Sequence, residues 1–120
     1  MLNLDTNILI CSLTGQLRLD ERSLLEQDVW AISPMVLWEI AKLVQLNRIG
    51  LNLDAPNVVR QLSQLEILPI DMNVARASTQ LDFHSDPADE LIAATSIVYG
   101  VPLVTRDRVM RQSKLVPLAT

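Results

Sequence analysis

Short apolar segments alternate with stretches of helical periodicity along the chain, and this alternation limits the possible folds more than any other feature. Four segments are apolar and short enough for buried strands, at residues 2–4, 29–32, 67–70 and 101–104. Strands that alternate with helices form a parallel sheet, because each crossover must return the chain to the same end of the sheet. The sequence therefore predicts an α/β fold, a three-layer α/β/α sandwich with a mainly parallel central sheet.

Turn and capping residues set the expected limits of the helices. The expected helices cover residues 8–13, 23–28, 34–46, 56–65, 74–81 and 88–99, with a short basic helix after residue 107. Ser33 is expected to cap the third of these helices, and Asp54 and Asp71 to cap the next two. The proline at position 69 places its strand at an edge or a strand end. Val116 is expected to pair at the far edge of the sheet.

Length and cysteine content narrow the class of protein. The 120 residues predict a single domain over 1–120, and the one cysteine, Cys11, excludes an intrachain disulfide framework and a multi-cysteine zinc site. The longest uncharged run, residues 91–105, is too short for a membrane span of about 20 residues. The N-terminus lacks a basic segment ahead of an apolar stretch, which is the pattern of a secretory signal. We therefore expect a cytoplasmic protein without a membrane association.

The charge balance argues against binding of nucleic acid by bulk electrostatics. The net charge is −4, and only four aromatic residues are present, which makes a base-stacking platform a poor expectation. The basic side chains are nevertheless concentrated in one C-terminal stretch, composed of Arg106, Arg108, Arg111 and Lys114. This stretch is either a contact for a nucleic-acid backbone or a solvated helix face, and the sequence favours neither.

Several acidic residues lie where a parallel α/β sheet binds its ligands, beyond the carboxyl ends of the strands. Asp5 directly follows the first expected strand, and Asp107 lies three residues after the last one. Glu39 lies in an otherwise apolar helix. Asp86 and Asp89 lie three residues apart at the start of another helix and so share one of its faces.

Each of these acids also has a purely structural interpretation. Asp5 and Asp86 could simply cap the helices that follow them, and Glu39 could face solvent. Asp89 or Glu90 could stabilise a helix N-terminus through the helix dipole, and Asp107 could begin the last helix. Taken together, however, carboxylates from four segments would repel one another unless a cation lay among them. Oxygen ligands select a hard ion, so the cluster predicts Mg²⁺ or Mn²⁺ rather than zinc. His84 lacks a partner for a soft-metal site and is expected to be a loop residue near the pocket.

Four motifs occur in order along the chain. They are Leu4-Asp5-Thr6-Asn7, Ile32-Ser33 with Trp38-Glu39-Ile40, His84-Ser85-Asp86-Pro87-Ala88-Asp89 with Ile92-Ala93-Ala94-Thr95, and Leu103-Val104-Thr105-Arg106-Asp107. The set resembles the motifs of PIN-domain nucleases, with the greatest likeness to the VapC-like toxins of bacterial toxin–antitoxin pairs. One position departs from the subgroup, because Glu90 stands directly after Asp89 where a basic residue is usual.

The resemblance implies a metal-dependent endoribonuclease. By its motifs the acidic quartet is Asp5, Glu39, Asp89 and Asp107, the accessory acid is Asp86, and the polar residues of the pocket are Thr6, Asn7, Ser33 and Thr105. Within the quartet, Asp5, Asp89 and Asp107 would hold Mg²⁺ or Mn²⁺, and Glu39 would orient or deprotonate the attacking water. The implied partners are an RNA substrate, a second copy of the chain and a small antitoxin protein.

Two other functions remain open at the level of the sequence. A receiver-like phosphoacceptor domain also gathers acids at the carboxyl end of a sheet, but it needs a lysine on a late loop. The two lysines, Lys42 and Lys114, do not closely follow expected strands. A PIN-like binding module without catalysis would share the fold, and the presence of all four acids argues against that loss.

Overall fold

A computed structural model describes residues 1–26 and 28–120. Its elements along the chain are β1 (Leu2–Leu4), α1 (Thr6–Leu13), α2 (Leu19–Leu25), β2 (Trp30–Ile32), α3 (Pro34–Gln45), α4 (Pro56–Ser63), β3 (Glu66–Ile67), α5 (Met72–Ser78), α6 (Pro87–Tyr99), β4 (Leu103–Val104) and α7 (Arg108–Arg111). None of the helices in these residues is long and apolar enough to cross a membrane.

The strands form one sheet in the order β3-β2-β1-β4, and every neighbouring pair is parallel. β1 and β2 occupy the interior, and Asn3 of β1 pairs with Ala31 on one side and Leu103 on the other. The connections from β1 to β2 and from β2 to β3 step in one direction, whereas the connection from β3 to β4 runs back across the sheet. With right-handed crossovers, α1 and α4 therefore cover one face and α5 and α6 the other.

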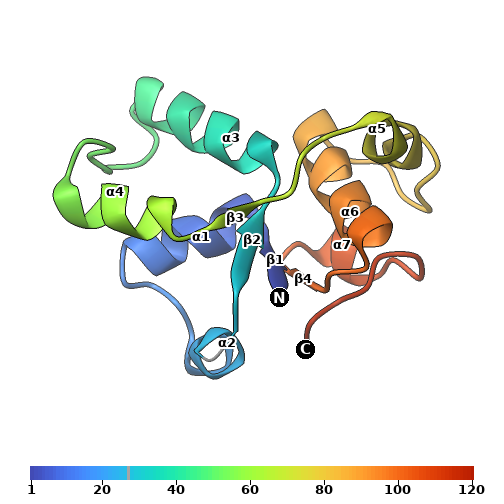
Figure 1. Ribbon diagram of the computed structural model, residues 1–120, viewed down its shortest axis with the longest axis horizontal. Helices are drawn as coiled ribbons and strands as arrows, with labels where there is room; N and C mark the ends of the chain where they lie inside the picture. The colour runs from blue at the N-terminus through green and yellow to red at the C-terminus, as the bar shows by residue number, and fades with distance from the viewer. Residues whose placement is uncertain (27) are drawn as a thin grey trace.

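Figure 1 shows these layers, with α1 and α4 on one side of the strands and α5, α6 and α7 on the other. The predicted three-layer α/β fold with a parallel sheet is confirmed. α3 follows β2 and packs against both α1 and α6, so it joins the two helical layers. The carboxyl ends of β1 and β4 lie next to this junction of helices.

The limits of several elements differ from the prediction for local reasons. α1 begins at Thr6 rather than Ile8, because the Asp5 carboxylate accepts a hydrogen bond from the Thr6 N–H. α2 begins at Leu19, where the Glu21 side chain accepts from the Arg18 N–H at 2.8 Å. The predicted helix at 23–28 is thus wrong at its start, and residue 27 lies outside the described residues.

Two of the three expected caps are present. The Ser33 hydroxyl accepts from the Met35 N–H at 3.2 Å, and the Asp71 carboxylate accepts from the Val74 N–H at 3.0 Å. The cap expected of Asp54 is wrong: α4 begins at Pro56, so Ala55 occupies the N-cap position without a side-chain cap, and Asp54 lies in the preceding turn, where the Asn52 side chain accepts from its N–H.

The far edge of the sheet also differs from the prediction. Leu118, not Val116, forms a parallel bridge with Leu103. The Val116 N–H donates instead to the Ser113 hydroxyl at 3.1 Å, so its backbone belongs to the preceding turn. The carbonyl of Pro117 accepts from the Leu103 N–H and the Ala119 N–H donates to the Leu103 carbonyl, at 2.8 and 2.9 Å.

A buried polar link crosses the core between β1 and α6. The side-chain amide of Asn3 donates to the carbonyl of Ile92 at 3.2 Å and to the hydroxyl of Ser96 at 2.9 Å. All three residues are fully buried. Since the core around them is apolar, these bonds cannot easily be exchanged for bonds to water. The link therefore sets the position of α6 against the strand that ends at Asp5.

The caps give a direct test of the fold. We expect Asp71→Ala to lower the free energy of unfolding by about 1 kcal/mol, because the first turn of α5 loses its side-chain acceptor. Asp71→Asn should retain most of that stability, since an amide oxygen also accepts from the backbone. Asp54→Ala is the matched control and should change little. Urea unfolding measures all three, and equal losses from Asp54→Ala and Asp71→Ala would contradict the assignment of the caps.

Candidate active site

A cleft of about 360 Å³ lies beside the carboxyl ends of β1 and β4 and is bounded by α1, α3 and α6. Its lining residues are Asp5, Thr6, Asn7, Ile10, Glu39, Leu43, Asp89, Arg106 and Asp107. The four carboxylates that the sequence singled out therefore line one cleft, although they come from a strand end, two helices and a loop. The parallel sheet accounts for this, because it delivers the segments that follow β1, β2 and β4 to the same end, and α6, which leads into β4, begins at that end.

Asp5 lies deepest in the cleft, and 6% of its surface is exposed. Its N–H donates to the Val104 carbonyl, and its carboxylate accepts from the Thr6 N–H at 2.9 Å and from the Thr105 hydroxyl at 2.6 Å. Burial raises the pKa of Asp5 to about 6; the hydrogen bonds from Thr105 and Thr6 oppose this shift, and the charges of Asp89 and Glu39 add to it. Asp5 thus caps α1 and also lies in the acidic cluster.

Glu39 faces the cleft from α3, not the solvent. Its carboxylate accepts a short hydrogen bond from the Thr6 hydroxyl. Burial raises its pKa, the bond from Thr6 opposes that shift, and the negative charges of Asp89 and Asp86 raise it further. The preceding residue, Trp38, is exposed on the outer surface of the same helix.

Asp89 enters the cleft from the first turn of α6. Its carboxylate accepts from the Ser85 hydroxyl at 3.1 Å. Burial raises its pKa, the bond from Ser85 opposes the shift, and the charges of Asp107, Asp86 and Glu90 raise it further. Ser85 lies within one of the four motifs, but sequence reasoning gave it no role because a loop serine has many possible partners.

The other acids of the segment before α6 are peripheral. Asp86 is exposed at the N-cap position of α6; its carbonyl accepts from the Glu90 N–H, and its side chain makes no capping bond. Asp86 is not among the residues that line the cleft, and it acts there only through its charge. His84 is exposed in the same loop and does not line the cleft.

Asp107 and Ser33 both cap helices near the cleft. The Asp107 carboxylate accepts from the Met110 N–H at 3.0 Å at the start of α7, and its own N–H donates to the Thr105 hydroxyl at 3.0 Å. Asp107 also lines the cleft, so it both caps a helix and lies in the acidic cluster. Ser33 is fully buried at the start of α3 and does not line the cleft.

The cleft fits a hydrated hard cation better than a fully enclosed ion. In residues 1–26 and 28–120, no three His, Cys, Asp or Glu side chains are grouped closely enough to enclose a metal. Mg²⁺ commonly keeps several waters and uses only one or two carboxylates directly. The donor atoms are carboxylate and hydroxyl oxygens. Burial and the charges of neighbouring carboxylates raise the pKa values of Asp5, Glu39 and Asp89, and a bound cation would stabilise their charged forms.

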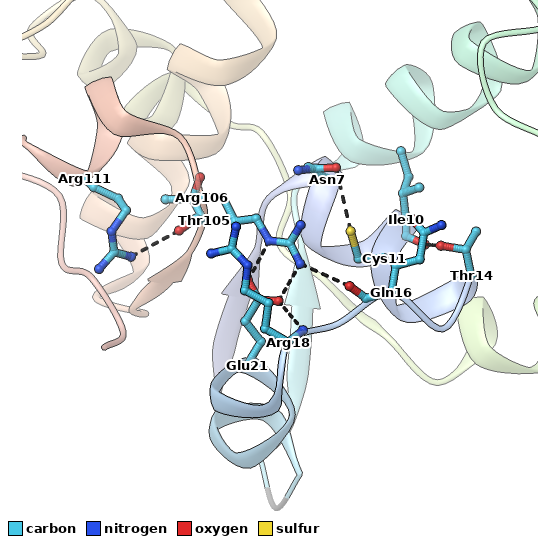
Figure 2. A network of polar contacts seen from close by, with 10 residues as sticks. All are labelled: Asn7, Ile10, Cys11, Thr14, Gln16, Arg18, Glu21, Thr105, Arg106 and Arg111. Atoms are coloured by element: carbon cyan, nitrogen blue, oxygen red, sulfur yellow. Dashed lines mark hydrogen bonds and ion pairs between the residues drawn. The ribbon is translucent and has the colours of Figure 1, made fainter.

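The basic residues of the C-terminal stretch make different contacts in the structure. Arg106 lines the cleft and forms a bidentate ion pair with Glu21 of α2, from Nε to Oε2 at 2.7 Å and from Nη2 to Oε1 at 2.6 Å (Figure 2). The hydrogen bond from Arg106 lowers the pKa of Glu21 to about 2. Arg111 donates to the Thr105 carbonyl at 3.1 Å, and Arg108, Arg111 and Lys114 are all exposed.

Glu21 is a second residue near the cleft, besides Ser85, to which sequence reasoning gave no role. It lies 85 residues from Arg106 and outside every motif, in a segment expected to precede a helix. The one local signal is its place three residues after Arg18, where a glutamate can close a helix N-terminus by accepting from the backbone.

Comparisons with known proteins identify the family. The PIN domain model matches residues 3–114. Ribonuclease VapC22 of Mycobacterium tuberculosis is 34% identical over 90 residues, which cover 72% of this chain and 69% of that relative.

Solved structures match the fold over nearly the whole length. VapBC2 from Rickettsia felis, bound to a DNA fragment from its promoter, matches with a TM-score of 0.74 at 21% identity. The match covers 99% of this chain and 98% of the Rickettsia chain. FitAcB from Neisseria gonorrhoeae matches with a TM-score of 0.75 at 24% identity. The match covers 100% of this chain and 97% of the Neisseria chain. Because the family match spans almost all of the sequence, and the relative is 34% identical over 90 residues, the chain belongs to the PIN domain family and is VapC-like.

Proposed function

We propose that this protein is a metal-dependent endoribonuclease and the toxin of a toxin–antitoxin pair. The observation that carries the proposal is the gathering of Asp5, Glu39, Asp89 and Asp107 in one cleft at the end of the sheet. The name of the relative, Ribonuclease VapC22, and the toxin–antitoxin complexes among the structural neighbours support the choice of RNA as substrate and of an antitoxin as partner.

Asp5, Asp89 and Asp107 would hold Mg²⁺ or Mn²⁺, directly or through water. Such an ion supplies a nucleophile from water at neutral pH and stabilises charge on the phosphate and the leaving oxygen. Glu39 would accept the proton of the attacking water, because its carboxylate faces the cleft and burial raises its pKa above the ordinary value, which makes it a stronger base.

Hydroxyl groups fix the carboxylates. Thr6 donates to Glu39, Thr105 donates to Asp5 and Ser85 donates to Asp89. Partners of this kind orient the groups that hold a metal, and their loss commonly lowers metal affinity or activity. We therefore assign Thr6, Thr105 and Ser85 to the orientation of the acids rather than to contact with RNA. Asn7 is exposed at the rim of the same cleft, within reach of a ligand.

The proposed partners have to cover apolar surface on the helices. Leu37 and Trp38 of α3, together with Leu46 at its end, are exposed. Exposed apolar side chains on neighbouring turns are common at protein interfaces. We assign the helical surfaces to a second copy of the chain and to the antitoxin.

A receiver-like phosphoacceptor function is disfavoured. The residues lining the described cleft include no lysine. Lys42 is exposed on α3 and donates to Gln45, and Lys114 is exposed beyond α7. The positive charge at the rim comes instead from Arg106, which is bound by Glu21.

Cleavage of RNA tests the proposed function. We expect Asp5→Asn to abolish Mg²⁺-dependent cleavage while the fold is retained, because it removes a charge from the cleft and keeps the shape of the side chain. Asp71→Asn, at a helix cap outside the cleft, should cleave like the parent. A gel assay with RNA in Mg²⁺ or in EDTA, together with circular dichroism, measures both. Cleavage that continues in EDTA, or equal loss in the two variants, would contradict the proposal.

The acid cluster should also make the stability of the metal-free protein depend on pH. The pKa of Asp5 is about 6 in the folded chain against an ordinary 3.8, so the folded state binds the proton more tightly. The free energy of unfolding should therefore fall as pH rises through this window, by about 3 kcal/mol from Asp5. Glu39 and Asp89, whose pKa values are also raised, act with the same sign.

Urea unfolding in EDTA at a series of pH values checks this dependence. Asp5→Asn should gain stability relative to the parent as pH rises from about 4.5 to about 6.5, because the variant has no buried charge at that position to desolvate. Asp71→Asn serves as the control and should keep the slope of the parent. Parallel curves for the parent and Asp5→Asn would show that the cleft does not disfavour the charge of Asp5.

Arg108 and Lys114, two of the exposed residues of the basic stretch, give a separate prediction about RNA; Arg111 is also exposed, but its guanidinium donates to the Thr105 carbonyl. If Arg108 and Lys114 bind phosphates of a single strand, their replacement by Gln should weaken binding to all sequences and reduce the salt slope by ~0.7 for each phosphate that is no longer neutralised. Arg60→Gln, an exposed change on α4, is the control. RNA affinity measured at several salt concentrations in the Asp5→Asn background checks this. An unaltered slope would assign the two side chains to a solvated surface.

A further inference from the structure

We infer that Glu21 of α2 is a positioning residue for the carboxylate cleft and acts through its bidentate ion pair with Arg106. The inference deepens the proposed function and rests on it, because it concerns how the acids of that same cleft are held in place. Glu21 does not line the cleft, so its effect has to pass through Arg106.

The segment from Thr105 to Asp107 joins β4 to α7, and each of its residues has a separate anchor. Thr105 donates to the Asp5 carboxylate at 2.6 Å, and Asp107 caps α7. Arg106, between them, is bound by Glu21. A shift of Arg106 would therefore displace Thr105, which contacts Asp5, and Asp107, which lines the cleft.

Glu21 is itself firmly held. It is 8% exposed, and its carboxylate accepts from the Arg18 N–H at 2.8 Å while it accepts twice from Arg106. Nη2 of Arg106 also donates to the Gln16 carbonyl at 3.3 Å. Figure 2 shows the guanidinium between α2 and the connection that leads into it, so the anchor belongs to a different part of the chain from the segment it holds.

The geometry separates this pair from an ordinary surface ion pair. Exposed ion pairs with a single contact contribute little to the free energy of unfolding. A planar guanidinium that makes two parallel bonds to a buried carboxylate has in addition a defined orientation. Lysine has a single charged centre and cannot make this contact. The pair is therefore suited to fix the direction of the Arg106 side chain and, with it, the backbone at Thr105 and Asp107.

The test uses Glu21→Gln, Arg106→Gln, the double variant, and Arg106→Lys, which keeps the charge. The control is Asp28→Asn, which removes a carboxylate from another ion pair, at 2.6 Å from the N-terminal amine and beside the amino end of β2. Three measurements apply to each protein: Mn²⁺ affinity by calorimetry without RNA, amide hydrogen exchange at Asp107, and kcat and KM for RNA cleavage.

We expect Glu21→Gln, Arg106→Gln and Arg106→Lys each to lower Mn²⁺ affinity and kcat by about 10- to 100-fold, with a smaller change in KM. The double variant should lose no more than either single variant, because both changes break the same ion pair. Exchange at the Asp107 N–H, which donates to the Thr105 hydroxyl, should become faster, and Asp28→Asn should match the parent.

Three results would overturn the inference. One is unchanged Mn²⁺ affinity and Asp107 exchange in Glu21→Gln; another is a loss in Glu21→Gln that is absent from Arg106→Gln. A third is normal behaviour of Arg106→Lys with loss of RNA affinity alone in Arg106→Gln, which would make Arg106 an RNA contact. Amide exchange in Arg106→Lys decides the matter if Glu21→Gln does not fold. A parent that neither binds Mn²⁺ nor cleaves RNA would instead reject the proposed function, whatever the exchange rates show.

Discussion

The burial of the Asp5 carboxylate at the end of β1 is the constraint on which the rest of the site depends. Burial raises its pKa to about 6, and two further acids of the cleft, Glu39 and Asp89, are displaced in the same direction. Such an arrangement opposes folding when the groups are charged, and it persists because hydroxyl and backbone donors offset part of the unfavourable energy. The chain thus keeps charge in a place that stability alone would not select.

The fold makes this concentration of charge possible. β1 lies inside the sheet, so the residue that follows it is enclosed by the segments after β2 and β4. The buried contacts of Asn3 with Ile92 and Ser96 hold α6 against β1, and Asp89 lies one turn before Ile92 on that helix. The position of Asp89 relative to Asp5 is therefore determined by polar contacts in the core as well as by apolar packing.

The layers and the four acids of the cleft could be predicted because their signals are local or periodic. Alternating apolar segments define the parallel sheet, and parallel topology then assigns residues such as Asp5 and Asp107 to one end of it. Positions that depend on a single competing hydrogen bond could not be predicted. Asp54 lies in a turn in which Asn52 binds its N–H, so that the helix begins only after Ala55, and Val116 leaves the sheet because Ser113 binds its N–H. The pairing of Glu21 with Arg106 is harder still, since no periodicity relates residues 85 positions apart.

The edges of the sheet carry a consequence for recognition. On one side, the backbone of Leu103 is already bonded to Pro117 and Ala119. On the other, β3 has only two residues, and Pro69, two residues after its end, has no N–H to donate. In the part of the chain that the structure describes, one edge strand is thus paired along its outer side and the other is very short, which limits the main-chain groups on which another polypeptide could extend the sheet. We therefore expect a protein that binds this chain to contact the side chains of its helices. The selectivity of such a contact depends on shape and side-chain chemistry and not on the addition of a strand to the sheet.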